Sequence, residues 1–161
     1  MRELPHTHYC FVCGESNRKG LNLRFETDGR VVCNRFVPQP EHVGFKHAMH
    51  GGLVATLLDE MMVWACAVRT KRFAYCAELT VRYVNPVPPN QATLAIAQLV
   101  ADRRGRLFEA KAELRDERGT LLASASGKYL PVDAKEAAAM AGDMLGDPES
   151  VLGPRASEAK P

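Results

Sequence analysis

The sequence has few aromatic residues and almost no net charge. Aromatic residues make up 7% of its 161 positions, and 21 Lys+Arg against 19 Asp+Glu leave a formal charge of +2. A protein that binds nucleic acid through bulk charge needs a strongly basic domain, so no nucleic-acid partner is expected. A disordered chain is excluded as well, because 46% of the residues are hydrophobic. The length and composition indicate one globular domain.

The sequence also lacks an apolar leader and a long uninterrupted apolar run. The opening residues Met1–Pro5 are polar, so we expect no signal peptide, a reducing cytoplasmic location and five unpaired cysteines. The longest apolar run, residues 53–68, is shorter than the roughly 20 residues that a bilayer requires. It carries Asp59 and Glu60 at its centre, so no membrane partner is expected either.

The hydrophobic pattern predicts one central helix and six strands. Between Gly51 and Val68, 13 of 18 residues are apolar and cover the whole circumference of the expected helix, 50–68. Such a helix is surrounded by protein. The strands are expected over residues 21–27, 30–37, 75–83, 93–101, 107–115 and 121–130, with Asp28-Gly29 joining the first two in a hairpin. The short turns between the later strands predict an antiparallel meander.

This pattern predicts an α+β fold in which a curved antiparallel sheet wraps around the helix. A single sheet leaves one flank of the helix open, so a second subunit is the expected cover. We divide the chain into an irregular N-terminal segment (1–20), the folded domain (21–131), and a C-terminal part (132–161). The last part is expected to hold a short helix around 137–141 and a mobile tail.

The residues from His50 to Asp59 carry the sharpest chemical signal. Gly51 and Gly52 leave backbone N–H groups unobstructed at a helix start, where the helix dipole favours a polarised carbonyl oxygen. Asp59 lies about 10–12 Å further along the helix, so one helix cannot bring both groups to one carbonyl carbon. Two antiparallel helices across a dimer axis could do so. The alternative is that the glycines permit close packing and the acids form structural hydrogen bonds.

The spacing His50-Gly51-Gly52-x6-Asp59 resembles the signature of hotdog-fold acyl-CoA thioesterases, in particular the phenylacetate-pathway (PaaI-like) branch. Weaker likenesses, which extend the resemblance over residues 9–131, are Cys10–Gly14, Glu78–Pro86, Gly105–Phe108 and 123–129. The resemblance implies a hotdog fold and hydrolysis of a short- or medium-chain or aryl acyl-CoA without a cofactor. It also implies a homodimer or a homotetramer built as a dimer of dimers.

The resemblance further implies roles for individual residues. Asp59 matches the catalytic carboxylate, Gly51 the polarising N–H group, and His50 the histidine that shapes this end of the site. Candidates for binding the substrate are Gly52, Cys76 and the basic turn of Arg103, Arg104 and Arg106. Cys76 stands where relatives usually carry Ser or Thr, and Gly44 where some carry Asn. Glu60, roughly 100° around the helix from Asp59, is a rival for the carboxylate role.

Two other functions remain open. The departures at Cys76 and Gly44 fit a non-catalytic protein that binds acyl-CoA. The closely spaced His6, His8, Cys10 and Cys13 have the identity of zinc ligands and fit a zinc-binding structural or interaction protein. The principal prediction, a thioesterase, has no metal at its site.

Overall fold

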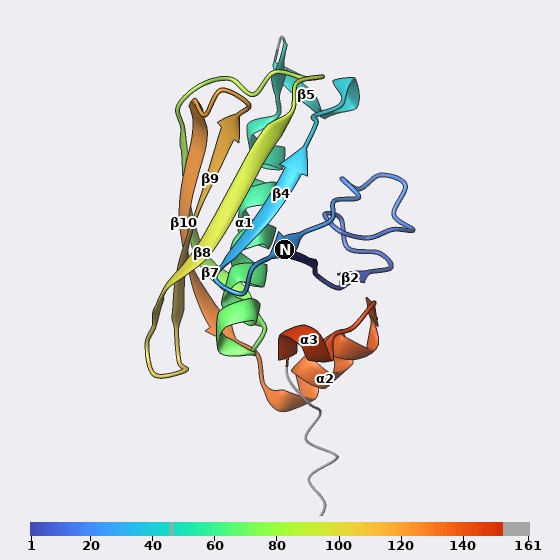
Figure 1. Ribbon diagram of the computed structural model, residues 1–161, viewed down its shortest axis with the longest axis vertical. Coiled ribbons are helices and arrows are strands. Elements are labelled where there is room, and N and C mark those ends of the chain that lie inside the picture. The colour runs from blue at the N-terminus through green and yellow to red at the C-terminus, as the bar shows by residue number, and fades with distance from the viewer. Residues whose placement is uncertain (46, 153–161) are drawn as a thin grey trace, which may run out of the picture.

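A computed structural model describes residues 1–45 and 47–152. Its centre is helix α1 (Gly51–Thr70), which contacts five strands of a seven-stranded antiparallel sheet. Figure 1 shows the sheet on one side of α1, with the N-terminal segment and the two C-terminal helices on the other. The predicted sheet wrapped around one long helix is confirmed.

The large sheet has the order β1-β3-β4-β8-β9-β10-β7. Its strands are β1 (Arg2–Glu3), β3 (Glu26–Thr27), β4 (Val31–Phe36), β7 (Ala74–Tyr83), β8 (Thr93–Asp102), β9 (Phe108–Asp116) and β10 (Leu121–Pro131). Two small sheets pair β2 (His6–Thr7) with β11 (Met144–Leu145), and β5 (Val43–Phe45) with β6 (Ala48–Met49). The remaining helices are η1 (Pro40–His42), α2 (Ala134–Gly142) and α3 (Glu149–Leu152).

The core forms where large side chains of α1 meet small side chains of the sheet. Leu57, Leu58, Met61 and Met62 of α1 are fully buried. The buried positions of the facing strands include the alanines 95, 97, 110, 112, 123 and 125. Alternation along β8, β9 and β10 brings these alanines to one face. Small residues there let the helix lie close to the sheet, so that Asp59 on α1 comes within reach of strand side chains.

The strand predicted over residues 21–27 is wrong except for its last two residues, Glu26–Thr27. Leu21, Leu23 and Phe25 are buried in alternation, which explains the period-two pattern. Their backbone is bonded differently, however. The N–H groups of Leu21 and Leu23 donate to carbonyls of the N-terminal loop, Phe11 and Val12, at 2.8 Å each. The alternating hydrophobic residues therefore indicated correctly which side chains are buried, but the backbone of this segment is hydrogen-bonded to a loop and not to a strand.

The predicted meander holds for β8, β9 and β10 but not for β7. Strand β7 pairs with β10 and forms one edge of the sheet, while β8 lies between β4 and β9. The connection from β7 to β8, residues 84–92, contains Pro86, Pro88 and Pro89. Proline lacks the N–H that a tight ladder requires, and this long connection passes β10 and β9 to reach the middle of the sheet.

Both ends of the described chain pack onto this frame. Strand β1 joins β3 at the sheet edge, and β2 pairs with β11. Leu4, Val12 and Cys13 are buried in the core. Helix α2 contains the helix predicted around 137–141, whereas the end of the predicted mobile tail, 153–161, lies outside the described residues.

Helix α1 is long and apolar enough, by length and composition, to cross a membrane. Ten of its residues, including Leu57, Met61 and Trp64, are buried against the rest of the protein. A core helix passes the same length and composition test, and the contacts of α1 are those of a core helix.

Candidate active site

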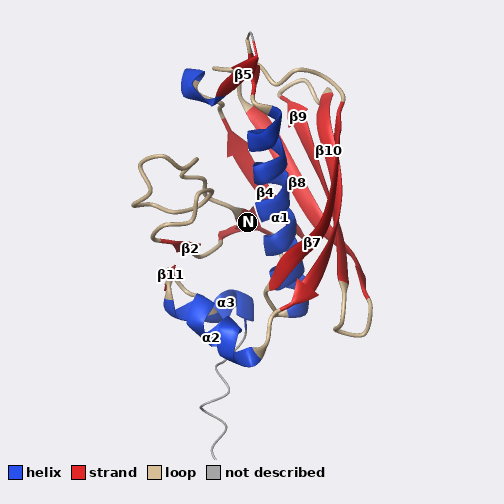
Figure 2. Ribbon diagram, turned by 180° about the vertical axis from the view of Figure 1, so that it is seen from behind, coloured by secondary structure: helices blue, strands red, loops and turns tan. Residues whose placement is uncertain are grey.

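Asp59 lies on the stripe of α1 that the fold leaves partly open. Gly52, Thr56, Asp59 and Val63 follow one another at helical spacing, and each is half-buried or exposed. Figure 2 shows this helix from the side that the sheet does not cover, with β7 along its flank. Asp59 is therefore held by the fold and still accessible.

Tyr129 of β10 fixes the carboxylate of Asp59. Its hydroxyl donates a hydrogen bond of 2.9 Å to Asp59 Oδ1, and its side chain is fully buried. Burial, followed by the charge of Asp59, raises the pKa of Tyr129 well above its usual range, so the phenol is a neutral donor. Gly127 makes room for the ring, since a Cβ there would lie 2.6 Å from Tyr129 Cε2.

Cys76 of β7 lies on the same side of the carboxylate. It faces Tyr129 in the β7–β10 register. Burial, then a hydrogen bond to Asp59 and the Asp59 charge, raise the pKa of Cys76 to about 11. The thiol therefore stays protonated at neutral pH and serves as a second, weaker donor. Two neighbouring strands thus supply neutral donors to one helix carboxylate.

The start of α1 is built by His50 and Tyr83. His50 is the N-cap, and its Nδ1 accepts the Gly52 N–H at 2.9 Å. In the neutral ring the proton then resides on Nε2. The Tyr83 hydroxyl donates to the Gly51 carbonyl at 2.8 Å, so the Gly51–Gly52 peptide is held at both its oxygen and its N–H.

Of the first four N–H groups of α1, only that of Gly51 has no acceptor among the described residues. The N–H of Gly52 donates to the His50 ring, and those of Leu53 and Val54 donate to the His50 carbonyl. Helix starts favour negative charge at such a group. The N–H of Gly51 can therefore bind an oxygen from outside the chain, whereas that of Gly52 is already bound within it.

Gly44 of β5 has a steric reason to be glycine. A Cβ at this position would lie 2.7–2.9 Å from His50 atoms, including the His50 Cα. An asparagine there would displace His50, the cap of α1. This chain has glycine where some relatives have asparagine, and β5 lies so close to the start of α1 at this position that a side chain would not fit.

The predicted basic turn lies at the opposite end of α1 from Gly51. The Arg72 guanidinium, just past the helix, donates to the Gly105 carbonyl at 2.9 Å, and Figure 1 shows the β8–β9 turn beside that end. Arg103 is paired with Glu109 at 2.9 Å. Arg104 and Arg106 are exposed and form no ion pair with any described residue, so they are the arginines of this turn that could bind an anion.

Glu60 is directed to the other side of α1. Its Oε1 accepts the Trp64 indole N–H at 3.1 Å and lies 3.7 Å from Cys10 Sγ. Burial raises the pKa of Glu60 to about 8. The rival carboxylate therefore contacts the N-terminal segment and is absent from the open stripe.

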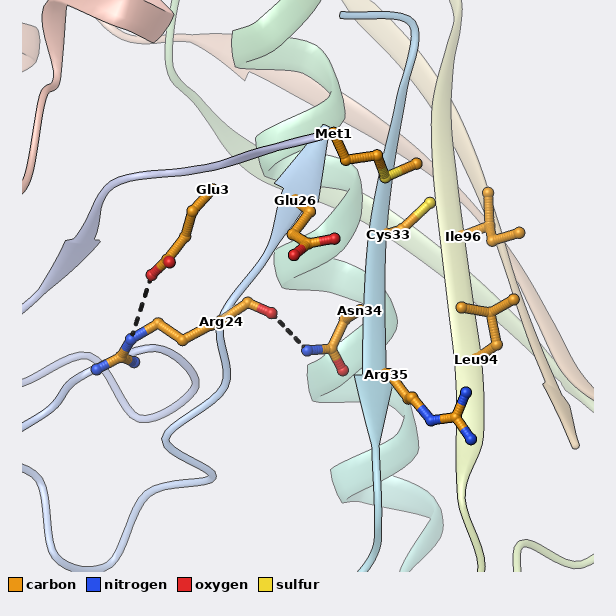
Figure 3. A pocket seen from close by; sticks show the side chains of 9 residues that line it. All are labelled: Met1, Glu3, Arg24, Glu26, Cys33, Asn34, Arg35, Leu94 and Ile96. Atoms are coloured by element: carbon orange, nitrogen blue, oxygen red, sulfur yellow. Dashed lines mark hydrogen bonds and ion pairs between the residues drawn. The ribbon is translucent and has the colours of Figure 1, made fainter. Parts of the chain in front are cut away.

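A cavity of about 620 Å³ lies elsewhere, near strands β3, β4 and β8. Figure 3 shows its lining, which includes Arg24, Asn34 and Ile96. None of the predicted site residues lines it. The candidate site is thus an open stripe on one protomer and is separate from this pocket.

Sequence reasoning gave no role to Tyr129, Gly127 or the hydroxyl of Tyr83. One signal was available: a buried tyrosine needs a partner for its hydroxyl, and Gly127 two residues earlier shares its face of the strand. The sequence does not show which side chain of α1 binds the Tyr129 hydroxyl, because this depends on how β10 lies against the helix.

Comparison with known proteins relates the central part of the chain to one family. The model of the Thioesterase superfamily matches residues 47–123, which run from just before α1 into β10. Residues 47–123 are thus similar to the thioesterase superfamily. The matched range contains Asp59, Gly51 and Cys76, whereas Tyr129 lies beyond it. A search of curated proteins found no match.

Solved structures agree with the hotdog fold. A thioesterase superfamily protein superposes with a TM-score of 0.69 at 24% identity, over 77% of this chain and 60% of its own length. The Escherichia coli PaaI protein of the phenylacetic acid degradation operon gives 0.66 at 16% identity, over 74% and 86%. A Streptococcus mutans protein bound to acetyl CoA gives 0.64 at 15% identity, over 69% and 89%.

Proposed function

We propose that this protein hydrolyses an acyl-CoA thioester, with Gly51 and Asp59 contributed by different protomers. The observation that carries the proposal is the arrangement on α1: an N–H without an acceptor at its start, and a carboxylate held by Tyr129 on its open stripe. The superfamily match and the acetyl CoA bound to the Streptococcus mutans protein support this class of substrate. By resemblance to PaaI we favour short- or medium-chain and aryl acyl groups.

The edge strand β7 supports a shared site. It is ten residues long, and its backbone pairs with that of β10 alone among the described strands. Tyr75 and Tyr83 on it are 53% and 55% exposed. A long unpaired edge favours pairing with a second copy, and a twofold axis makes such a contact self-complementary. Pairing at β7 would continue the sheet and place the two α1 helices side by side and antiparallel.

Such a dimer would bring a Gly51 N–H and an Asp59 carboxylate together, although the two are too far apart within one helix. Gly51 and Asp59 are eight residues apart, which is about 12 Å along α1. Because Asp59 is bounded by Cys76 of β7, it faces the edge at which the partner would add. The start of the partner's helix could then approach this carboxylate. A homotetramer built from two such dimers is compatible with this arrangement.

The proposed chemistry follows from these groups. The thioester carbonyl oxygen accepts the Gly51 N–H of one protomer, and this bond strengthens as negative charge develops on the oxygen in the transition state. Asp59 of the other protomer either removes a proton from water, which attacks the carbonyl carbon, or attacks that carbon itself. In the first route the C–S bond breaks, the leaving thiolate takes the proton held by Asp59, and the products are the CoA thiol and a carboxylic acid. In the second route the C–S bond breaks to leave an anhydride between the acyl group and Asp59, and water hydrolyses this anhydride to the carboxylic acid and the free Asp59 carboxylate while one proton of the water passes to the CoA thiolate. Tyr129 and Cys76 orient the carboxylate throughout.

The basic turn offers a place for the CoA phosphates. Arg104 and Arg106 lie near the end of α1, about 17 Å along the helix from Asp59. An extended CoA molecule could span this interval, with its phosphates near the arginines and its thioester near the carboxylate. Arg103, already paired with Glu109, would contribute only general positive charge. The cytoplasmic location expected from the sequence remains part of the proposal.

The test compares Asp59→Asn with Asp143→Asn. Asp143 is exposed at the end of α2, far along the chain from the site, so its change from carboxylate to amide is a matched control. Hydrolysis of short-chain, medium-chain and aryl acyl-CoA is measured by thiol release. We expect Asp59→Asn to lose about 10²–10⁴-fold in kcat, the usual contribution of a general base, and Asp143→Asn to match the wild type.

Two results would contradict the proposal. Full activity of Asp59→Asn would remove this carboxylate from the mechanism. Tight binding of acyl-CoA by the wild type without any turnover would instead support the non-catalytic binding protein, for which Cys76 in place of a hydroxyl is the favouring feature.

A further inference from the structure

The N-terminal segment brings two cysteines to the face of α1 that carries Glu60, about 100° around the helix from Asp59. One ligand atom each from Cys10, Cys13 and Glu60 lies within 4.8 Å of the other two. Cys13 is buried, and the other two residues are half-buried. The cluster joins residues 50 positions apart in the sequence, and the thioesterase mechanism uses none of them.

The backbone around the cysteines has a specific local structure. The Val12 N–H donates to Cys10 Sγ at 3.3 Å, and the Gly14 N–H donates to the Cys10 carbonyl at 2.9 Å. A Cβ at Gly14 would lie 2.4 Å from the Cys10 carbonyl oxygen, so this tight turn requires glycine. A backbone N–H directed at sulfur favours the thiolate form, which is the metal-binding form of cysteine.

The donor set and its dimensions suit zinc. Two cysteine sulfurs and one carboxylate are zinc ligands, whereas calcium and magnesium select oxygen atoms alone. Zn–S and Zn–O distances of about 2.3 and 2.0 Å place tetrahedral ligand atoms about 3.3–3.8 Å apart. Cys10 Sγ and Glu60 Oε1 are already 3.7 Å apart. The remaining atoms need shifts of at most about 1 Å, which side-chain rotation provides.

We propose that Cys10, Cys13 and Glu60 bind one zinc ion, which fastens the N-terminal segment to helix α1. The Trp64 indole N–H, 3.1 Å from Glu60 Oε1, orients the carboxylate as an outer hydrogen-bond donor. A water molecule or the second carboxylate oxygen completes the coordination. The zinc ion holds the turn of residues 10–14 against the helix that carries Asp59.

This ligand set differs from the one considered from the sequence. His6 Nε2 lies 3.2 Å from a Glu15 carboxylate oxygen, and neither His6 nor His8 belongs to the cluster. Glu60, distant in the sequence, takes their place.

The test measures zinc in the full chain, purified with a thiol reductant and without an affinity tag that binds metal. We expect one zinc per chain by elemental analysis. After chelation, zinc is titrated back against a chromogenic competitor. Cys10→Ser, Cys13→Ser and Glu60→Gln should each bind zinc about 100-fold more weakly or worse, because loss of a direct ligand costs at least as much as loss of an outer donor.

Three control variants define the site. Cys33→Ser removes a thiol of β4 outside the cluster, and His6→Ala removes a histidine that was considered as a ligand from the sequence but lies outside the cluster. Both should retain zinc. Asp59→Asn should also retain it, so a failure of the thioesterase proposal is distinguished from a failure of the zinc proposal.

Other results would overturn the zinc site. One is that the wild type binds zinc no more tightly than Cys10→Ser does. Another is that His6→Ala loses zinc. A third is that mass spectrometry finds a Cys10–Cys13 disulfide that persists in reductant. If the cysteine variants do not fold, cobalt(II) added to the chelated wild type decides the question. Thiolate-to-cobalt charge-transfer absorption is expected, and its absence contradicts the proposal.

Discussion

Replacing Gly51 by proline would remove one N–H group while leaving the helix start in place. Proline is well tolerated at the first position of a helix, because its missing N–H has no partner within the helix. His50 has φ −58° and ψ 129°, a conformation that a following proline permits. The N–H of Gly51 has no acceptor among the described residues, so the substitution costs no hydrogen bond in the free protein.

Gly51→Ala is the matched control for this change. Its Cβ, like that of proline, would lie about 3.3 Å from the Tyr83 ring, which must then move by a few tenths of an ångström. Both variants therefore add the same Cβ, whereas only alanine keeps the N–H that proline replaces with the Cδ of its ring. The difference between the two variants isolates the proposed hydrogen bond to the thioester oxygen.

Loss of one preorganised donor to an oxyanion costs about 10²–10³ in kcat, or about 2.7–4 kcal/mol. We expect Gly51→Pro to lose this much relative to Gly51→Ala, with both variants folded and in the same oligomeric state. The assay is thiol release at saturating acyl-CoA, with thermal unfolding and sedimentation as checks. Equal kcat in the two folded variants would refute the assignment of the Gly51 N–H as the polarising donor.

Three further outcomes are expected. Tyr129→Phe keeps the buried ring but removes the hydrogen bond to the proposed catalytic carboxylate, so stability should fall by about 1 kcal/mol and kcat should fall while KM is little changed. Gly127→Ala puts a Cβ 2.6 Å from the Tyr129 ring; such overpacking costs about 1–3 kcal/mol and should lower the melting temperature. Removal of both Arg104 and Arg106 should raise KM for acyl-CoA a few-fold and reduce its salt dependence, since exposed ion pairs contribute about 0.2–1 kcal/mol each; Arg118→Ala in the next turn should change neither.

The sequence was most informative where burial and geometry follow from one repeating pattern. Helix α1 was predicted from its apolar circumference. Strands β7, β9 and β10 were predicted from alternation and β8 from a run that is apolar on both faces, with prolines and tight turns between them. The strand at residues 21–27 failed because alternation reports which side chains are buried, whereas the hydrogen-bond partner of Leu21 and Leu23 is a loop. The order of strands also escaped prediction, since pairing of β7 with β10 depends on a long crossover.

The same limit applies to the candidate site. The roles expected for Gly51 and Asp59 came from a motif contained within one helix. Tyr129 could not be assigned to Asp59, because their contact depends on the register of β10, 70 residues away. Glu60 was weighed as a rival carboxylate, and its direction toward Cys10 follows from packing of the N-terminal segment. Contacts with distant elements thus give Asp59 and Glu60 different surroundings, although the two acids are adjacent in the sequence.

Mixed dimers show whether one active site is built from two protomers. Chains that carry Asp59→Asn and chains that carry Gly51→Pro are co-expressed with different tags, and the mixed dimers are isolated. In a shared site, the first chain supplies an intact Gly51 N–H and the second an intact Asp59. Each mixed dimer then has one complete site of two, so we expect about half of the wild-type kcat per dimer. Activity no higher than that of the two variant homodimers would contradict the account.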